Sequence, residues 1–276
     1  MCFSTKGSWP AHSFVSASAL VALAIVIASV APISSAQESA LDFDGIDDFA
    51  FIESPTGWNF STSALTIETW IRPSDISGST FRGIVSNDFT FVIAQHFSDY
   101  SALVWSISLG PTDAAVTPTG SLVVDRWDHF ACTYDGTTMR IFQNGAPVAE
   151  QVHIAGGPVW INYDLFLGTW PSADGFAGVI DELRIWNAVR TEAEINAWMN
   201  RPLTGSEPDL LGYWRLDEGS GQVIVDSSAL ANNGVLGSTT AVEPEDPSWT
   251  ADAAPLAFFY DGFESATTSA WSVTIP

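Results

Sequence analysis

The sequence is poor in cysteine and in positive charge. Cys2 lies in an apolar N-terminal stretch and Cys132 stands alone after it, so the rest of the chain has no internal disulfide. Lys6 is the sole lysine, and from Gln37 onward eight arginines face 32 acidic residues, a net charge of −24. Such a surface repels nucleic acids, anionic lipids and sulfated glycans. It favours the binding of divalent cations. The alternative is that the acidic residues serve only to keep the protein in solution.

Residues 1–36 are predicted to be a signal peptide. Lys6 precedes an apolar run over residues 17–31, and the small residues Ser34 to Ala36 come directly before Gln37, as at a cleavage site. The run is shorter than the roughly 18–20 residues that a membrane span needs. We therefore expect cleavage between Ala36 and Gln37 rather than an anchor. The expected product is secreted, extracellular or at the cell surface, with no membrane insertion after cleavage.

Short β-rich segments separated by turn residues fill most of the remaining chain. Asp135-Gly136 and Asn144-Gly145 separate such runs, and these pairs are strong hairpin signals. One helix is predicted after Thr191, which forms a capping-box pattern with Glu194. Strands are predicted over residues 65–72, 89–97, 102–109, 126–134, 138–143, 165–167, 177–186, 210–216 and 222–225. Many strands and one short helix predict an all-β, antiparallel double-sheet jelly roll.

The composition divides the chain after the signal peptide into three parts. Residues 37–237 form the predicted jelly-roll domain, and residues 238–257, rich in proline, alanine and acidic residues, resemble a linker. Residues 258–276 are aromatic and contain DGFES followed by SAWS. This tail is similar to C-terminal sorting elements of many secreted Gram-negative bacterial proteins. The alternative is a last edge strand.

Four sequence blocks, in order, resemble laminin G-like domains of the concanavalin A-like lectin/glucanase fold. They are LDFDGIDDF at 41–49, LTIETWIRP at 65–73, RWDHFACTYDGTTMRIFQNG at 126–145 and GVIDELRIWNAVR at 178–190. A fifth, at 211–234, stands before the first block in many relatives. Here it comes last, and we expect it to pair with the N-terminal strand. The resemblance implies a concanavalin A-like sandwich.

The acidic run after Ala40 predicts a cation site. Asp42, Asp44, Asp47 and Asp48 fall within seven residues, and such carboxylates repel one another unless a cation or backbone N–H groups lie among them. The alternative is a turn in which aspartates bond their own backbone without any metal.

Asp181, on a later strand, is a further candidate for the same cation site. Strand alternation places it on the face of Leu183 and Ile185, where a carboxylate is costly unless it is paired or metal-bound. Because the first and last strands of a closed jelly roll meet, we predict that Asp44, Asp47 and Asp181 bind a structural Ca²⁺ with backbone carbonyls.

Flat aromatic side chains suggest carbohydrate binding. Trp170 and Trp58 are the predicted ligand-binding residues, and Trp105 and Trp160 are also candidates for exposure, whereas tryptophans inside strand patterns are expected in the core. The chain lacks the Glu-x-Asp pattern with a further Glu that carries catalysis in endoglucanases of this fold.

We therefore predict a non-enzymatic binding module that recognises a glycan or a cell-surface or matrix protein. The alternatives are a structural or adhesive display module without a small ligand and, less favoured, a glycoside hydrolase.

Overall fold

The computed structural model describes residues 38–58, 61–78, 80–87, 90–107, 114–152, 159–160, 163–170 and 174–256. The predicted signal peptide, its cleavage site at Ala36 and Gln37, and the C-terminal tail lie outside these residues.

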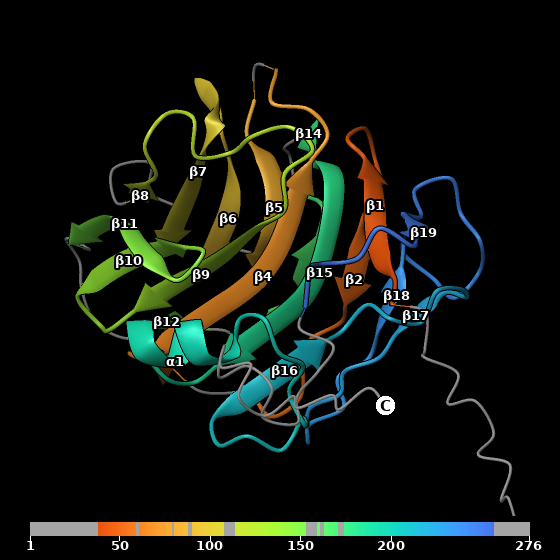
Figure 1. Ribbon diagram of the computed structural model, residues 1–276. Helices are drawn as coiled ribbons and strands as arrows, with labels where there is room; N and C mark the ends of the chain where they lie inside the picture. The colour runs from red at the N-terminus through yellow and green to blue at the C-terminus, as the bar shows by residue number, and fades with distance from the viewer. Residues whose placement is uncertain are drawn as a thin grey trace, which may run out of the picture. The chain divides into compact units, whose positions relative to one another are not determined.

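Two β-sheets form the layers of the domain (Figure 1), which confirms the predicted fold class. Sheet A has the order β11-β10-β9-β4-β15-β1-β19, and β16 also pairs with β15. Its described strands are β1 (Ala40–Asp44), β4 (Leu65–Pro73), β9 (Asp128–Tyr134), β10 (Thr138–Gln143), β11 (Ala146–Val152), β15 (Ala177–Trp186), β16 (Leu210–Trp214) and β19 (Ser248–Thr250).

Sheet B has the order β17-β18-β2-β13-β5-β6-β7-β8, with β14 parallel to β5. Its described strands are β2 (Ala50–Ile52), β5 (Arg82–Asn87), β6 (Phe91–His96), β7 (Asp99–Ile107), β8 (Ala114–Val116), β13 (Leu165–Leu167), β14 (Asp174–Gly175), β17 (Val223–Ile224) and β18 (Gly234–Leu236). A small ribbon pairs β3 (Ser61–Thr62) with β12 (Val159–Trp160).

The core lies between the sheets and contains every second residue of the long strands. Leu41, Ile67 and Ile180 enter it from sheet A, and Ile93 enters it from sheet B. Cys132 is buried there, and burial raises the pKa of its thiol. It therefore packs as an apolar residue instead of acting as a nucleophile.

The predicted hairpins and helix are present. Asn144 and Gly145 both have positive φ and join β10 to β11, as a two-residue type I′ turn requires. Helix α1 (Glu192–Trp198) begins at Thr191 with both hydrogen bonds of a capping box. The helix packs on the outer face of sheet A, because Ile195 contacts Ala131 and Phe142 of β9 and β10.

A bulge in β15 shifts the alternation of its side chains. The register slips between Asp181 and Arg184, and Glu182 has a φ of +54°. Leu183 and Ile180 both face the core, while Asp181 pairs with the outward Trp70. The prediction that Asp181 shares a face with Leu183 is therefore wrong, because the inserted residue moves every later side chain by one step.

The segment predicted as a linker contains part of sheet A. Strand β19 pairs with β1, with Thr250 opposite Ala40, and Phe49 donates its N–H to the carbonyl of Glu245 at 3.1 Å. Residues 238–256 thus extend the domain beyond Gly237. The fifth sequence block takes another place than expected, since its strand β16 pairs with β15 and its strand β17 pairs with β18, and neither pairs with β1.

Candidate functional site

The acidic run forms a tight turn at the end of β1. Gly45 has a φ of +80°, and a Cβ there would lie 2.6 Å from the Cβ of Ala177, so only glycine fits. Asp44 Oδ1 accepts the Ile46 N–H at 2.7 Å, and Asp48 Oδ2 accepts the Asp44 N–H at 2.8 Å. The turn brings carboxylate oxygens of Asp44, Asp47 and Asp48 within 4.8 Å of one another.

This acidic turn has the donor chemistry that calcium prefers. Burial, together with the nearby charges of Asp44 and Asp47, raises the pKa of Asp48 to about 6, so the cluster is electrostatically crowded. Asp44 and Asp48 each use one oxygen in the turn, and their second oxygens, together with Asp47, could serve as hard ligands for a cation. Three carboxylates are about half of the six to eight oxygens that Ca²⁺ takes. The residues fit the ion, although the same hydrogen bonds also suit a turn without metal.

Asp181 does not join this turn. Asp44 lies opposite Ala177, and Asp181 is four residues further along β15, about 13 Å away along the strand. Its carboxylate accepts the N–H groups of Glu182 and Ala254, each at 2.8 Å. Asp48 takes the place that we predicted for Asp181. The position of Asp48 within the acidic run is the sequence feature that could have identified it as a candidate ligand.

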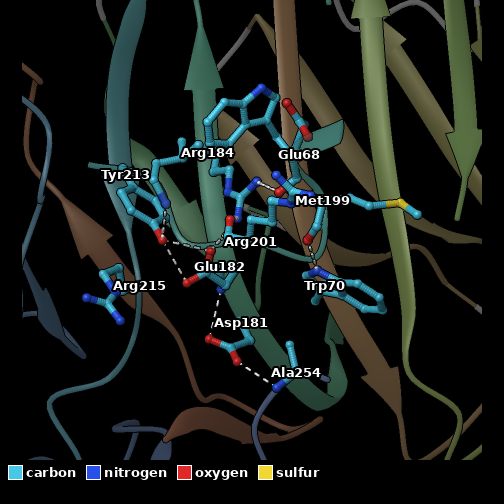
Figure 2. Close-up of polar contacts among 12 residues, drawn as sticks. Glu68, Trp70, Asp181, Glu182, Arg184, Met199, Arg201, Tyr213, Arg215 and Ala254 are labelled. Carbon is cyan, nitrogen blue, oxygen red and sulfur yellow. Dashed lines mark hydrogen bonds and ion pairs between the residues drawn. The ribbon is translucent and has the colours of Figure 1, made fainter. Parts of the chain in front are cut away.

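A buried polar network lies on the outer face of β4 and β15 (Figure 2). Arg184 Nη2 lies 2.6 Å from Glu182 Oε2 and donates to the carbonyl of Arg201 at 2.7 Å. Tyr213 donates its hydroxyl to Glu182, and Trp70 Nε1 donates to the carbonyl of Met199 at 2.8 Å. These bonds fasten the chain that follows α1 to the bulge of β15.

The carboxylates of the network are closed off from solvent. Burial raises the pKa of Asp181 and of Glu182, although Arg184 opposes the shift at Glu182. Every named carboxylate in it already accepts hydrogen bonds from the chain, and Asp181 and Glu182 are each at most 3% exposed. The network therefore offers solvent no carboxylate for acid–base chemistry.

Trp58 is a core residue, contrary to the prediction. Its side chain has no exposed surface, its Nε1 donates to the carbonyl of Leu211 at 3.0 Å, and its ring meets Trp214 edge-on. Because the indole N–H finds an acceptor, the whole side chain can be buried. Trp105 is also fully buried. The side chain of Trp160 lies outside the described residues.

Trp170 lies over the outer face of sheet B. Gly168 turns the chain with a φ of +80°, and Thr169 then passes so close to β5 that a Cβ on Gly83 would lie 2.3 Å from its carbonyl carbon. The Ser86 hydroxyl donates a hydrogen bond to the Thr169 carbonyl at 2.9 Å. The half-buried Trp170 packs above Val92 and its neighbours on β6 and β7.

The ring of Phe81 adjoins Trp170, and the rings of His96 and Phe97 adjoin Phe81. We call the surface formed by Phe81, His96, Phe97 and Trp170 the aromatic platform. Ring centroids are 6.0 Å apart for Phe81 and Trp170, and 5.0 Å apart for Phe81 and Phe97. His96 lies 4.7 Å from Phe97, whose side chain is 48% exposed. Sequence reasoning missed Phe81 and Phe97, although Phe97 lies with the polar Ser98 in the turn between β6 and β7.

The sequence model of the concanavalin A-like lectin/glucanases superfamily matches residues 44–196. The chain belongs to this superfamily. It is also 35% identical to mouse pappalysin-1 over 96 residues, which are 33% of this chain and 6% of pappalysin-1. The chain thus spans only a small part of that relative.

Two solved structures of low sequence identity share the fold. A candidate carbohydrate-binding protein from Bacteroides ovatus is 21% identical with a TM-score of 0.64, covering 80% of this chain and 61% of that one. The heptameric SAP-like pentraxin from Limulus polyphemus is 14% identical with a TM-score of 0.52, covering 73% and 95%. Among the described residues, no helix has the length and hydrophobicity needed to cross a bilayer.

Proposed function

We propose that this chain is an extracellular, non-enzymatic module that binds a neutral glycan through the aromatic platform. The observation that carries the proposal is the half-buried Trp170, which packs on β6, follows a segment that is hydrogen-bonded to β5, and lies beside the ring of Phe81. A rigid aromatic face offers contact area to the C–H surface of a sugar at little cost in conformational entropy.

Charge and fold support a neutral glycan as the ligand. The net charge of −24 from Gln37 onward disfavours sulfated or otherwise anionic polymers. The structural likeness to a candidate carbohydrate-binding protein supports the same class of ligand at the level of the fold. A cell-surface or matrix protein carrying such a glycan is the expected partner.

We further propose that the acidic turn holds a structural Ca²⁺ through Asp44, Asp47 and Asp48. The ion would neutralise the crowded carboxylates at the end of β1. The proposal of a non-enzymatic role is supported by the buried network, which engages the adjacent carboxylates of Asp181 and Glu182 with the protein itself.

A glycan array probed with the full chain, with and without Ca²⁺, tests the function. We expect neutral glycans to be retained and Trp170→Ala to weaken retention about tenfold or more, equivalent to about 1.4 kcal/mol. Trp127→Ala is the matched control, because Trp127 is also half-buried but directly precedes β9 of sheet A. Retention of no neutral glycan, or equal retention by Trp170→Ala, would instead favour a display module without a small ligand.

A further inference from the structure

A row of apolar side chains crosses the outer face of sheet B on four neighbouring strands. Val223 of β17 lies opposite Val235 of β18, which in turn lies opposite Phe51 of β2. Phe51 lies opposite Phe166 of β13, and their ring centroids are 5.2 Å apart. The residues next to them in sequence that face the core are Ile224, Leu236, Ala50, Ile52, Leu165 and Leu167. All four side chains of the row therefore point outward.

This outer row is only partly covered. Antiparallel strands with one face in water ordinarily alternate apolar and polar residues, whereas strands that are apolar on both faces are ordinarily covered on both. The strands β2 (AFI) and β13 (LFL) contain no polar residue. Phe51, Phe166 and Val235 are nevertheless half-buried, and Val223 is 39% exposed. Contiguous apolar surface of this kind marks an interaction site.

The row continues towards the aromatic platform. Phe166 lies opposite Ser86 of β5, and Ser86 lies opposite Val92 of β6. Over these two strands the chain itself covers the row, because the carbonyl before Trp170 accepts the Ser86 hydroxyl and Trp170 packs on the cluster around Val92. Trp170 and Phe51 thus belong to one line across the sheet, over strands three spacings or about 14 Å apart.

The other end of the row borders a cavity of about 250 Å³ with polar walls. Phe51 and Val235 form its apolar side, and Asn233 and Thr240 contribute exposed polar side chains. Asn233 accepts the Asp226 N–H with its side-chain oxygen at 2.9 Å. Among the described residues, its NH₂ group and the Thr240 hydroxyl have no partner. These accessible groups can donate to hydroxyl groups of a ligand and accept from them.

Charge and chain direction disfavour a protein as the cover of this row. A second copy would bring together two chains that each carry a net charge of −24 from Gln37 onward. The described chain ends at Leu256, just after Ala254 bonds Asp181 of sheet A, so the C-terminal residues leave on the opposite sheet. A neutral ligand that combines apolar faces with hydroxyl groups fits both the row and the cavity.

We propose that sheet B binds an extended neutral polysaccharide, with one part of the glycan at Trp170 and another along Phe166 and Phe51. This inference rests on the proposed glycan-binding function and names its ligand class, which is a chain of several sugar residues instead of a single sugar.

Calorimetric titration of the full chain with neutral oligosaccharides of two lengths provides the test. The probes are the disaccharides and hexasaccharides of β-1,4-glucan, β-1,4-xylan, β-1,4-mannan and β-1,3-glucan. Because a disaccharide is too short to contact both Trp170 and Phe51, we expect the hexasaccharide of at least one series to bind about tenfold more tightly. Phe51→Leu and Phe166→Leu keep an apolar side chain without the ring. Each should remove most of this gain and leave the disaccharide affinity unchanged, whereas Trp170→Ala should weaken both lengths.

Two further variants serve as controls. Phe51→Tyr retains the ring and should retain the gain with length, and Trp127→Leu changes a half-buried aromatic residue beside sheet A and should bind both lengths like the original chain. A thermal melt of each variant checks that it is folded.

The outcomes separate the polysaccharide inference from the proposed function. Equal affinity for the two lengths, lowered by Trp170→Ala, would overturn the inference and leave the glycan-binding function standing. A gain with length that persists in Phe51→Leu and Phe166→Leu would contradict the path along β13 and β2. A dimer in sedimentation that Phe51→Leu abolishes would assign the row to a second copy. Binding of neither length in any series would overturn the proposed function together with the inference.

Discussion

The guanidinium of Arg184 lies 2.6 Å from the carboxylate of Glu182, and both side chains are at most 2% exposed. Arg184 also donates to the carbonyls of Trp198 and Arg201. A buried charge pair of this kind is strongly destabilising when only one partner is removed. The pair therefore adds to the attachment of the α1 region to sheet A, beside the Trp70–Met199 hydrogen bond and the packing of Ile195.

Arg184→Met should lower the free energy of unfolding by about 3–5 kcal/mol, because it leaves Glu182 buried without its cation. Urea denaturation measures the change. Arg140→Met is the control, since Arg140 pairs with Asp135 at the surface and should cost about 1 kcal/mol or less. Equal losses in the two variants would show that the buried pair has no special role in stability.

Millimolar Ca²⁺ should raise the melting temperature by several degrees where Na⁺ of matched ionic strength does not. A ligand that binds only the folded state adds about 2.7 kcal/mol at a hundredfold excess over Kd. Asp47→Asn should remove the shift, whereas Asp181→Ala should retain it, because Asp181 bonds Ala254 elsewhere. The exposed Glu53→Gln is the control. Equal melting temperatures in Ca²⁺ and in chelator would leave the acidic turn as a metal-free turn.

Deletion of residues 238–276 should destabilise the domain by at least about 2 kcal/mol, since it removes β19 and the Ala254 N–H bond to the buried Asp181. Deletion of residues 257–276 alone should leave the melting temperature unchanged. Differential scanning calorimetry distinguishes the two. If the longer deletion melts like the full chain, the pairing of β19 with β1 contributes nothing to stability.

Stability should rise as the pH falls from 8 towards 5. Burial raises the pKa values of Asp181, Glu182, Asp217 and Glu218, so the folded state binds protons that the unfolded state releases above about pH 4. Each such group destabilises the folded state fully above its folded-state pKa, and this effect decreases as the pH falls and disappears below its unfolded-state pKa.

The gain should reverse below about pH 4. Hydrogen bonds from Thr191 and Ser77 lower the pKa values of Glu194 and Asp75, and the stability that these groups contribute is lost as they protonate. We expect a maximum at about pH 4–5 in thermal melts. The melts are repeated in high salt, which screens the general repulsion of the acidic surface but affects buried groups less. A melting temperature that is flat from pH 8 to 5 in high salt would contradict the role of the buried carboxylates.

Local patterns in the sequence were sufficient for many strands, among them β4, β9, β10 and β15, and for the hairpins and the helix, but not for β5 (Arg82–Asn87) of sheet B. Asn144-Gly145 and the Thr191 capping box specify their structures through neighbouring residues, and both are present as expected. The placement of Asp181 failed because its face depends on the bulge at Glu182, which no local pattern reveals. Asp48 was overlooked as a candidate ligand although it lies in the same acidic run as Asp44.

The remaining differences between the predicted and the observed structure come from packing between residues far apart in the sequence. The burial of Trp58 depends on an acceptor from Leu211, 153 positions away in the sequence. Strand β19 lies in a proline-rich and acidic segment whose composition does not predict a strand. It is a strand because it pairs with the edge of β1. Trp170 was a candidate from the sequence and stays a prediction, whereas the rings of Phe81 and Phe97 come near it only through pairing within sheet B and the close approach at Gly83.

The pairing of β1 with β19 also determines how the domain responds to mechanical force. Ala40 at the start of β1 lies opposite Thr250 at the end of β19, so the chain enters and leaves the domain at the same end of one antiparallel ladder. Tension applied through the flanking chain would open these hydrogen bonds one after another instead of shearing them together. The bond between Ala254 and Asp181 lies just beyond Thr250 and would carry the load before β19 does. Extension should therefore begin at this edge, while the central strands of sheet A remain folded.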